Sequence, residues 1–379
     1  MNPNGKAVFL YGPELEAYPY PPTCPFNTTR AGKARAILLP MGLLSGPDHA
    51  EVPPMRAGRH VLEAFHTPDY LDVLERMSAG EYEFDWLAYG LGTGDCPAFV
   101  GVWDYSVLAC GASVQGAEMI LRGEAAVAFN PSGGLHHAFP ARAAGFCYLN
   151  DVVLACQTLA AAGRRVLFVD IDVHHGDGVQ AAFYDRDDVM TISLHQDGRT
   201  LFPGTGFVEE IGQGVGRGYA VNLPLPMGTY DAAYLRAFRE VVMPLAEAYG
   251  PDVIVLEIGA DTLAGDPLAG LSLTNNTIAE AIGLLRSLGR PILATGGGGY
   301  NIENTARTWA LAWTVLCGQE LDDEASAGLG GVFLQTPEWQ AGLRDRALAP
   351  GEAQRCAVDQ ILNVTIDQVK HLVFPLHGL

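Results

Sequence analysis

The residues best suited to chemistry lie in one polar segment, 170–178, which reads DIDVHHGDG and follows a run of apolar residues. In an extended backbone, side chains two residues apart point the same way, so Asp170, Asp172 and His174 would share one face. An aspartate carboxylate and a histidine nitrogen at that spacing can both reach one zinc ion at ~2 Å. Buried ionisable groups are costly without a purpose, so the segment predicts part of a metal site. The alternative is a polar strand end whose side chains only cap the backbone.

A third metal ligand is available in Asp261, which follows another apolar run in the segment EIGAD at 257–261. Three protein ligands with one open position are typical of catalytic zinc sites, whereas structural sites use four. Taken alone, Asp261 is explained equally well as a helix cap or a turn residue.

A second signal is the histidine pair His136 and His137, which follows a glycine turn in SGGLHH at 132–137. Zinc lowers the pKa of a bound water toward ~7, and a neighbouring imidazole can then take its proton. Such histidines need carboxylates on their other ring nitrogens, and Asp170 and Asp177 remain for that task. The pair therefore predicts proton transfer beside a metal ion, and a purely structural role is the alternative.

A third signal is the run of four glycines that precedes Tyr300, at 296–299. Consecutive glycines cost backbone entropy, so they indicate a strained turn or a close approach to another group. A tyrosine in such a turn could donate a hydrogen bond to an oxyanion. A flexible turn with a packed tyrosine explains this motif as well when it is taken alone.

The elements that must position these residues read as an α/β pattern. The first ~100 residues show no clear period beyond a helical stretch, but alternation becomes regular after them. Apolar strands that alternate with amphipathic helices are typical of a parallel sheet with helices on both faces. Polar, glycine-rich segments follow the strands, and ligand sites of such sheets lie beyond the carboxyl ends of the strands. The expected strands are Ala125–Phe129, Arg165–Val169, Val189–Leu194, Val253–Ile258 and Ile292–Ala294, and the expected helices are Pro68–Met77, Val152–Ala162, Asp231–Tyr249, Thr274–Leu288 and Glu303–Leu316.

Composition excludes several partners. The 379 residues carry a net charge of -20, from 43 acidic and 23 basic residues, and such a surface repels nucleic acid phosphates. The charge would attract basic protein segments, although solubility is the simpler interpretation. No apolar run approaches the ~20 residues of a membrane helix, and no signal peptide begins the chain. Seven scattered cysteines without CxxC spacing indicate reduced thiols, so we expect a cytoplasmic protein without nucleic-acid or membrane partners.

Two further motifs, GFCYLN at 145–150 and FPGTG at 202–206, complete an ordered set with the segments above. Together the motifs resemble the histone deacetylase family, and most closely its class I-like bacterial members of the acetoin utilization type. The resemblance runs from about Tyr18 to Gly318. It implies an arginase/deacetylase-type α/β fold, with a central, mostly parallel sheet flanked by helices in a single catalytic domain, 1–379.

By this resemblance, the zinc ligands are Asp172, His174 and Asp261, although ferrous iron suits the same donors. His137 is then the general base and acid, and His136 gives electrostatic support. Asp170 would orient His136, Asp177 would orient His137, and Tyr300 would hydrogen-bond the substrate carbonyl.

The resemblance also implies a substrate tunnel walled by Phe146 and Phe202, with Gly145 on its floor and Leu268 at its rim. Two aromatic walls suit the apolar methylenes of a lysine side chain. Asp95 would hold the substrate backbone at the rim, where the preceding glycine-rich turn is one residue longer than in the family, and Arg30 would line an inner cavity. The family also carries K⁺ or Na⁺ ions, which would lie near Asp170, Asp172, His174, Ser193 and Leu194, and near Phe183, Arg186, Val189 and Tyr219.

The predicted reaction is zinc-dependent hydrolysis of acyl groups, usually acetyl, from the ε-amine of lysine in proteins or peptides. An acetylpolyamine amidohydrolase is the nearest alternative, but its cationic substrates favour an acidic rim, whereas Leu268 is neutral. A two-metal ureohydrolase needs a bridging carboxylate where this chain has Leu263. A non-catalytic acyl-lysine reader is the third alternative, and it would be expected to lack one of the residues named above.

Overall fold

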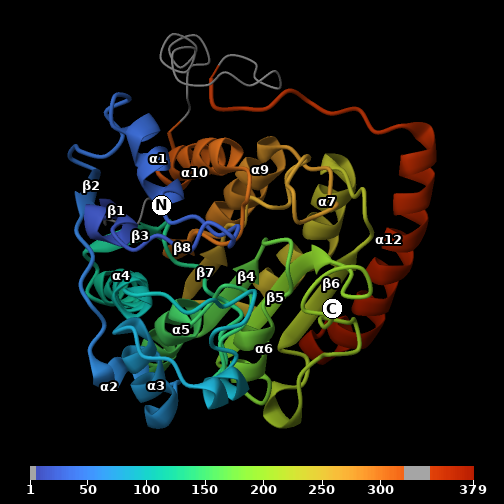
Figure 1. Cartoon of the computed structure of the whole chain (residues 1–379). Coiled ribbons are helices and arrows are strands. Elements are labelled where there is room, and N and C mark those ends of the chain that lie inside the picture. Colours follow the sequence, from blue (N-terminus) through green and yellow to red (C-terminus); the bar gives the residue numbers. More distant parts are fainter. Residues whose placement is uncertain (1–5, 320–341) are drawn as a thin grey trace.

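Eight strands form one sheet in the order β2-β1-β3-β8-β7-β4-β5-β6, and all pairings between these strands are parallel. The computed structural model describes residues 6–319 and 342–379 (Figure 1). The predicted domain, 1–379, thus includes residues 1–5 and 320–341, which lie outside the described residues. The strands are β1 (Lys6–Leu10), β2 (His49–Val52), β3 (Ala125–Asn130), β4 (Val166–Asp170), β5 (Val189–Gln196), β6 (Ala220–Leu225), β7 (Val253–Glu257) and β8 (Ile292–Thr295).

Helices cover both faces of the sheet (Figure 1). One layer holds α2 (Arg59–Leu62), α3 (Pro68–Ser78), α4 (Val102–Leu121), α5 (Asp151–Ala161) and α6 (Asp177–Phe183). The other holds α1 (Arg30–Leu38), α7 (Asp231–Ala237), α8 (Met243–Tyr249), α9 (Asn275–Ser287) and α10 (Ile302–Leu316), while α12 (Glu352–Val373) packs beside the edge strand β6.

Strand alternation divides the core between the two layers. In β4, Val166 and Phe168 pack with α5 and α6, whereas Leu167 and Val169 pack with the helices of the opposite layer. A sheet buried on both faces explains why its strands read as continuous apolar runs. The predicted fold class, an α/β domain with a mostly parallel central sheet, is confirmed. Among the helices that the structure describes, none is long and apolar enough to cross a membrane.

The five expected strands and four of the five expected helices are found within two residues of their predicted bounds. The stretch Asp231–Tyr249 is instead divided, because a π-helical turn at Phe238–Val242 separates α7 from α8. Pro244 lies in the first turn of α8. Since proline has no N–H to donate to the preceding turn, the wider π turn is expected there.

The prediction that the first ~100 residues are irregular was wrong, since they contain β1, β2 and α1. The strand β2 is only four residues long and lies at the edge of the sheet. Two of its four residues, His49 and Glu51, are polar. The buried face of α1 consists of two alanines, a leucine and Arg30, so its apolar contrast is too weak to show a helical period.

A row of buried polar residues crosses the sheet where its central strands end. Asn130, Thr295, Glu257, Asp170 and Ser193 are paired in register across β3, β8, β7, β4 and β5. The chain continues from β4 to β5 on one side and from β7 to β8 on the other. The sheet therefore reverses its winding between β4 and β7, and ligand sites of such folds lie at that point.

Candidate active site

Asp172, His174 and Asp261 form a compact cluster beyond the ends of β4 and β7. Nδ1 of His174 lies 3.1 Å from Oδ1 of Asp172 and 3.1 Å from Oδ2 of Asp261. All three residues are buried, and their donor atoms lie within 4.8 Å of one another. The strand itself ends at Asp170, so the chain bends between Asp172 and His174 and does not continue the expected alternation. The three sequence-predicted metal ligands are thus brought together.

The cluster fits a divalent cation. A Cβ atom at Gly259 would overlap the carboxylate of Asp172, and one at Gly298 would overlap that of Asp261, so glycines leave room for the donors. Burial, followed by repulsion from Asp172, raises the pKa of Asp261 to about 7. Two buried carboxylates with one imidazole between them therefore lack full charge compensation, which a dication would supply. Two oxygen donors and one nitrogen donor suit zinc or ferrous iron.

The histidine pair lies beside this cluster and is oriented by carboxylates. Nδ1 of His136 is 2.9 Å from Oδ2 of Asp170, and Nδ1 of His137 is 2.7 Å from Oδ1 of Asp177. The two Nε2 atoms are 3.0 Å apart. Since both Nδ1 atoms face carboxylates, both carry protons, and one further proton lies between the Nε2 atoms.

The electrostatics place that shared proton on His136. Burial lowers its pKa, but the charges of Glu257 and Asp170 outweigh burial and raise the pKa well above its ordinary value. Burial, followed by the charge of His136, lowers the pKa of His137 to about 4. His137 is therefore neutral at pH 7, and its Nε2 is the acceptor in the contact with Nε2 of His136.

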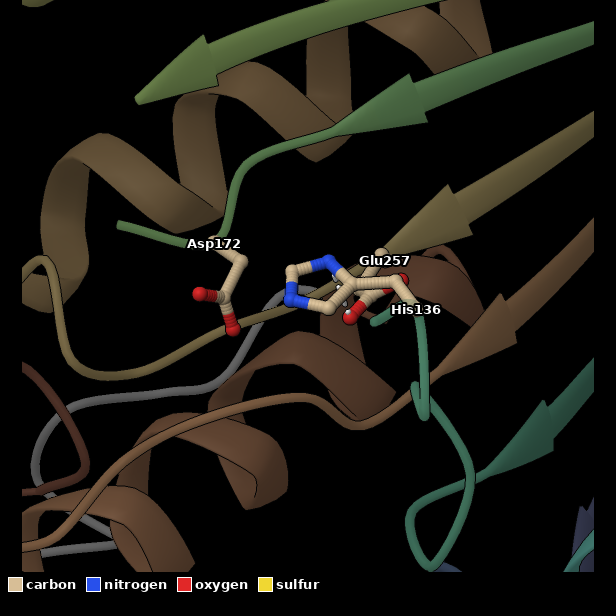
Figure 2. A group of neighbouring side chains, drawn as sticks. All are labelled: His136, Asp172 and Glu257. Carbon is tan, nitrogen blue, oxygen red and sulfur yellow. Dashed lines mark ion pairs between the residues drawn. The ribbon is translucent and has the colours of Figure 1, made fainter. Parts of the chain in front are cut away.

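Glu257 also belongs to this site, although no sequence motif marks it as a site residue. Oε1 of Glu257 forms an ion pair of 3.0 Å with Nδ1 of His136, as Figure 2 shows. His136, Asp172 and Glu257 are also close enough to form a second possible metal cluster. That cluster is the weaker choice, because Nδ1 of His136 already donates to Asp170 and Nε2 contacts His137. In the sequence, Glu257 is marked only by its position as an acidic residue at the end of an apolar strand. That strand, β7, lies next to β4, which ends at Asp170.

The start of α5 holds the histidine turn in place. The carboxylate of Asp151 accepts from the backbone N–H groups of Gly134 and Leu135. The side chain of Asn150 caps α5 through the N–H of Val153 and donates to the carbonyl of His136. Neither residue is recognisable in the sequence as part of the site, since each looks like an ordinary helix start.

Tyr300 lies beside the metal cluster, at the end of the glycine run that follows β8. Its ring is 6.4 Å from that of His174 and 5.8 Å from that of Phe146, between centroids. Burial raises the pKa of Tyr300 well above its ordinary value, so the phenol keeps its proton and can donate it in a hydrogen bond.

The aromatic residues expected to wall a tunnel also reach this point. The ring of Phe202 lies 5.0 Å from that of His137, between centroids, and is 44% exposed at the residue level. A Cβ at Gly145 would overlap His137 and crowd Phe202, so glycine is required between them. Phe146 adopts φ 68°, a strained conformation for a residue with a bulky side chain.

Asp95 and Arg30 support the loops of the site. One carboxylate oxygen of Asp95 accepts from the N–H of Gly145 at 3.0 Å, and the other accepts from the hydroxyl of Thr93. Arg30 is buried and donates from Nη1 to the carbonyl of Gly299 at 3.0 Å. Leu268 is half-buried and lies on the loop after Asp261. The predicted roles of these residues toward substrate, and the two monovalent-ion sites, stay predictions.

The family model of the histone deacetylase domain matches residues 24–316. The chain belongs to the histone deacetylase family. It is 38% identical over 322 residues to histone deacetylase RPD3 of Saccharomyces cerevisiae, which covers 84% of this chain and 73% of the relative. Histone deacetylase clr6 of Schizosaccharomyces pombe is 36% identical over 321 residues, or 84% of this chain and 78% of that relative.

Solved structures of family members agree with this fold. An HDAC homologue from Aquifex aeolicus gives a TM-score of 0.85 at 32% identity and covers 97% of this chain and 100% of its own. A crystal structure of an HDAC homologue complexed with SAHA gives a TM-score of 0.84 with the same identity and coverage. The predicted family is confirmed, and the two fungal relatives named above are histone deacetylases. The acetoin utilization type and the cytoplasmic location stay predictions.

Proposed function

We propose that the protein is a zinc-dependent lysine deacylase that hydrolyses acyl groups, acetyl first, from lysine side chains of proteins or peptides. One observation carries the proposal: the rings of His137 and Tyr300 lie 5.9 Å and 6.4 Å, between centroids, from the ring of His174. The donor cluster that His174 forms with Asp172 and Asp261 is therefore a point that both side chains adjoin. An amide carbonyl at that point would meet a base, a cation site and a hydrogen-bond donor, which are the components of metal-assisted amide hydrolysis.

Each residue then has a separate task. A divalent ion held by Asp172, His174 and Asp261 would polarise the amide carbonyl and acidify a nearby water. His137 takes a proton from the attacking water on Nε2 and later gives a proton to the leaving amine. Tyr300 donates a hydrogen bond to the oxygen on which negative charge develops.

The carboxylates keep the two imidazoles in position during these steps. Asp177 holds the proton on Nδ1 of His137, so the basic lone pair lies on Nε2, where water must take the place of Nε2 of His136 before its proton is accepted. Asp170 does the same for His136, whose positive charge lies next to the developing oxyanion. Phe146 and Phe202 exclude water and contact the methylenes of the lysine side chain.

The experiment is an assay of the purified protein on acetyl-lysine peptides and on acetylated polyamines. We expect hydrolysis of the peptides that is lost with a chelator and restored by zinc, and a parallel restoration with ferrous iron would compare the two metals. Activity confined to polyamines would replace the proposed substrate class. Binding of acyl-peptide without any hydrolysis by the zinc-loaded protein would identify a reader.

A further inference from the structure

A hollow of ≈ 600 Å³ adjoins the candidate active site and is lined in part by Phe202, one of the expected tunnel walls. Its other walls are the turn between the histidine pair and Gly145, which carries Phe139 and Arg142, and the helix α6, which begins at Asp177. No step of the proposed reaction uses this hollow. A volume of this size is typical of small-ligand pockets and is ample for one amino-acid side chain.

The hollow lies next to the place where an acyl-lysine would be bound. The ring of Phe202 is 5.0 Å from that of His137, between centroids, and Oδ1 of Asp177 is 2.7 Å from Nδ1 of the same histidine. Phe202 and Arg142 are both exposed, so the hollow opens to solvent beside the expected tunnel wall. Because one residue of extended chain spans ~3.5 Å, a peptide whose lysine contacts Phe202 would bring its next residues to this hollow.

Of the charged side chains that line the hollow, only Arg142 has its charge free. Asp177 accepts from Nδ1 of His137, and Glu210 accepts from Gln180 and from two backbone N–H groups of the Phe202 loop. The guanidinium of Arg142 has no hydrogen bond or ion pair within residues 6–319 and 342–379. A ligand that enters the hollow therefore meets two engaged carboxylates and one available cation.

The local structure holds Arg142 ready for such a ligand. The N–H of Phe139 donates to the carbonyl of Arg142 at 2.9 Å across a tight turn, and the carbonyl of Pro140 accepts the N–H of Thr67. The guanidinium lies over the ring of Phe139, 4.3 Å from its centroid. Stacking of this kind occupies the face of the guanidinium and leaves its N–H edges for a carboxylate, which they can bind in a bidentate manner.

We propose that this hollow is a subsite for an acidic side chain, Asp or Glu, that lies within two residues of the acyl-lysine in the substrate, and that Arg142 binds its carboxylate. The inference rests on the proposed function, because it assigns a sequence preference to that reaction. The net charge of -20 repels acidic peptides in general, so a preference for an acidic residue at one position would be a local effect of this cation.

The experiment uses acetyl-lysine peptides with glutamine at the two positions on either side of the lysine, and a set in which glutamate replaces one glutamine at a time. We expect glutamate at one of these positions to raise kcat/KM about threefold to fivefold at ~0.15 M salt, the effect of one partly exposed ion pair. The gain should appear in KM and not in kcat, since the contact is the same before and during the chemical step.

Substitutions of Arg142 test whether it causes the preference. The ratio of kcat/KM for the glutamate and glutamine peptides should fall to one or below in Arg142→Gln. Arg142→Lys should keep part of the preference, because it retains the charge but not the two-pronged contact. In Arg142→Glu the preference should reverse, so that a lysine at the same position gives the better substrate.

Arg164→Gln is the matched control. Arg164 is exposed and precedes β4, at the opposite end of the strand from Asp170, so its loss changes the net charge equally but should leave the glutamate preference intact. A preference that persists in Arg142→Gln, that is lost equally in Arg164→Gln, or that is absent from the wild type at every position would overturn the proposal.

A wild type that hydrolyses none of the peptides would remove the proposed function, and the subsite would then be decided by binding. Fluorescence anisotropy of labelled glutamate and glutamine peptides measures it on the zinc-loaded protein. Tighter binding of the glutamate peptide by the wild type but not by Arg142→Gln would support the subsite, whereas equal affinities in the wild type would overturn it.

Discussion

The backbone N–H of Tyr300 lies 2.8 Å from Oδ2 of Asp266, and Oδ1 of the same carboxylate accepts the N–H of Leu268 at 2.9 Å. One buried carboxylate thus joins the loop of the proposed oxyanion donor to the loop at the proposed tunnel rim. We predict that Asp266→Ala lowers kcat on an acetyl-lysine peptide about tenfold, because both loops lose a charge-assisted hydrogen bond. Steady-state kinetics measure it, and Asp266→Asn, which keeps an acceptor oxygen, should lose less. Equal losses in the two variants would contradict the hydrogen-bond explanation.

Tyr300→Phe removes the hydroxyl and leaves the ring in contact with Phe146. The expected result is a fall in kcat of about 10²- to 10³-fold, the usual effect of losing one oxyanion donor. KM should change little, since the hydrogen bond strengthens as charge develops. Tyr82→Phe, at an exposed tyrosine, is the control and should have wild-type kinetics. A comparable loss in the control, or full activity in Tyr300→Phe, would remove Tyr300 from the mechanism.

Removal of the metal should lower stability as well as activity. Without a cation, Asp172 and Asp261 remain close together and buried, so a chelator should lower the melting temperature and added zinc should restore it. Asp261→Asn should bind zinc more weakly and respond less to both treatments. The variants are compared by calorimetric melting curves and by metal analysis. Asp367→Asn, on the exposed face of α12, is the control. Equal chelator shifts in the wild type and Asp261→Asn would show that this cluster does not hold the ion.

The sequence predicted the centre of the sheet better than its margins. Central strands such as β4 are buried on both faces, so they appear as uninterrupted apolar runs, and polar residues mark where they end. The edge strand β2 is short and half polar, and α1 buries alanines and Arg30, so neither has the contrast on which a periodicity argument depends. Both elements lie at the edge of the fold, where packing and not periodicity decides the structure. Neither was therefore predicted from the sequence.

The same division applies to the site. Asp172, His174 and the histidine pair stand in compact motifs, and motif spacing is legible in a sequence. Glu257 is different, because its partner His136 lies on another strand's loop and only the register between β4 and β7 brings it beside Asp170. Asp266 likewise accepts a hydrogen bond from the backbone N–H of Tyr300, which lies 34 positions away in the sequence. Contacts of this kind depend on the tertiary fold, so one sequence does not reveal them.

His66 should make the fold sensitive to mild acid. It is buried, and its Nε2 accepts the N–H of Asn150, which begins α5. Burial lowers the pKa of His66 to about 4, whereas the unfolded chain has the ordinary value near 6.5. Above about pH 6.5 neither state binds this proton, and as the pH falls toward 4 only the unfolded state does, so stability decreases through that window.

The test is urea unfolding, followed by fluorescence at several pH values between 4 and 7, for the wild type and His66→Gln. Glutamine can accept the same N–H but does not titrate, so its stability should fall less steeply, by up to about 1 kcal/mol per pH unit. Because other titrating groups are common to both chains, the difference in slope isolates His66. Parallel stability curves for the two proteins would mean that His66 takes up its proton equally in the folded and unfolded states.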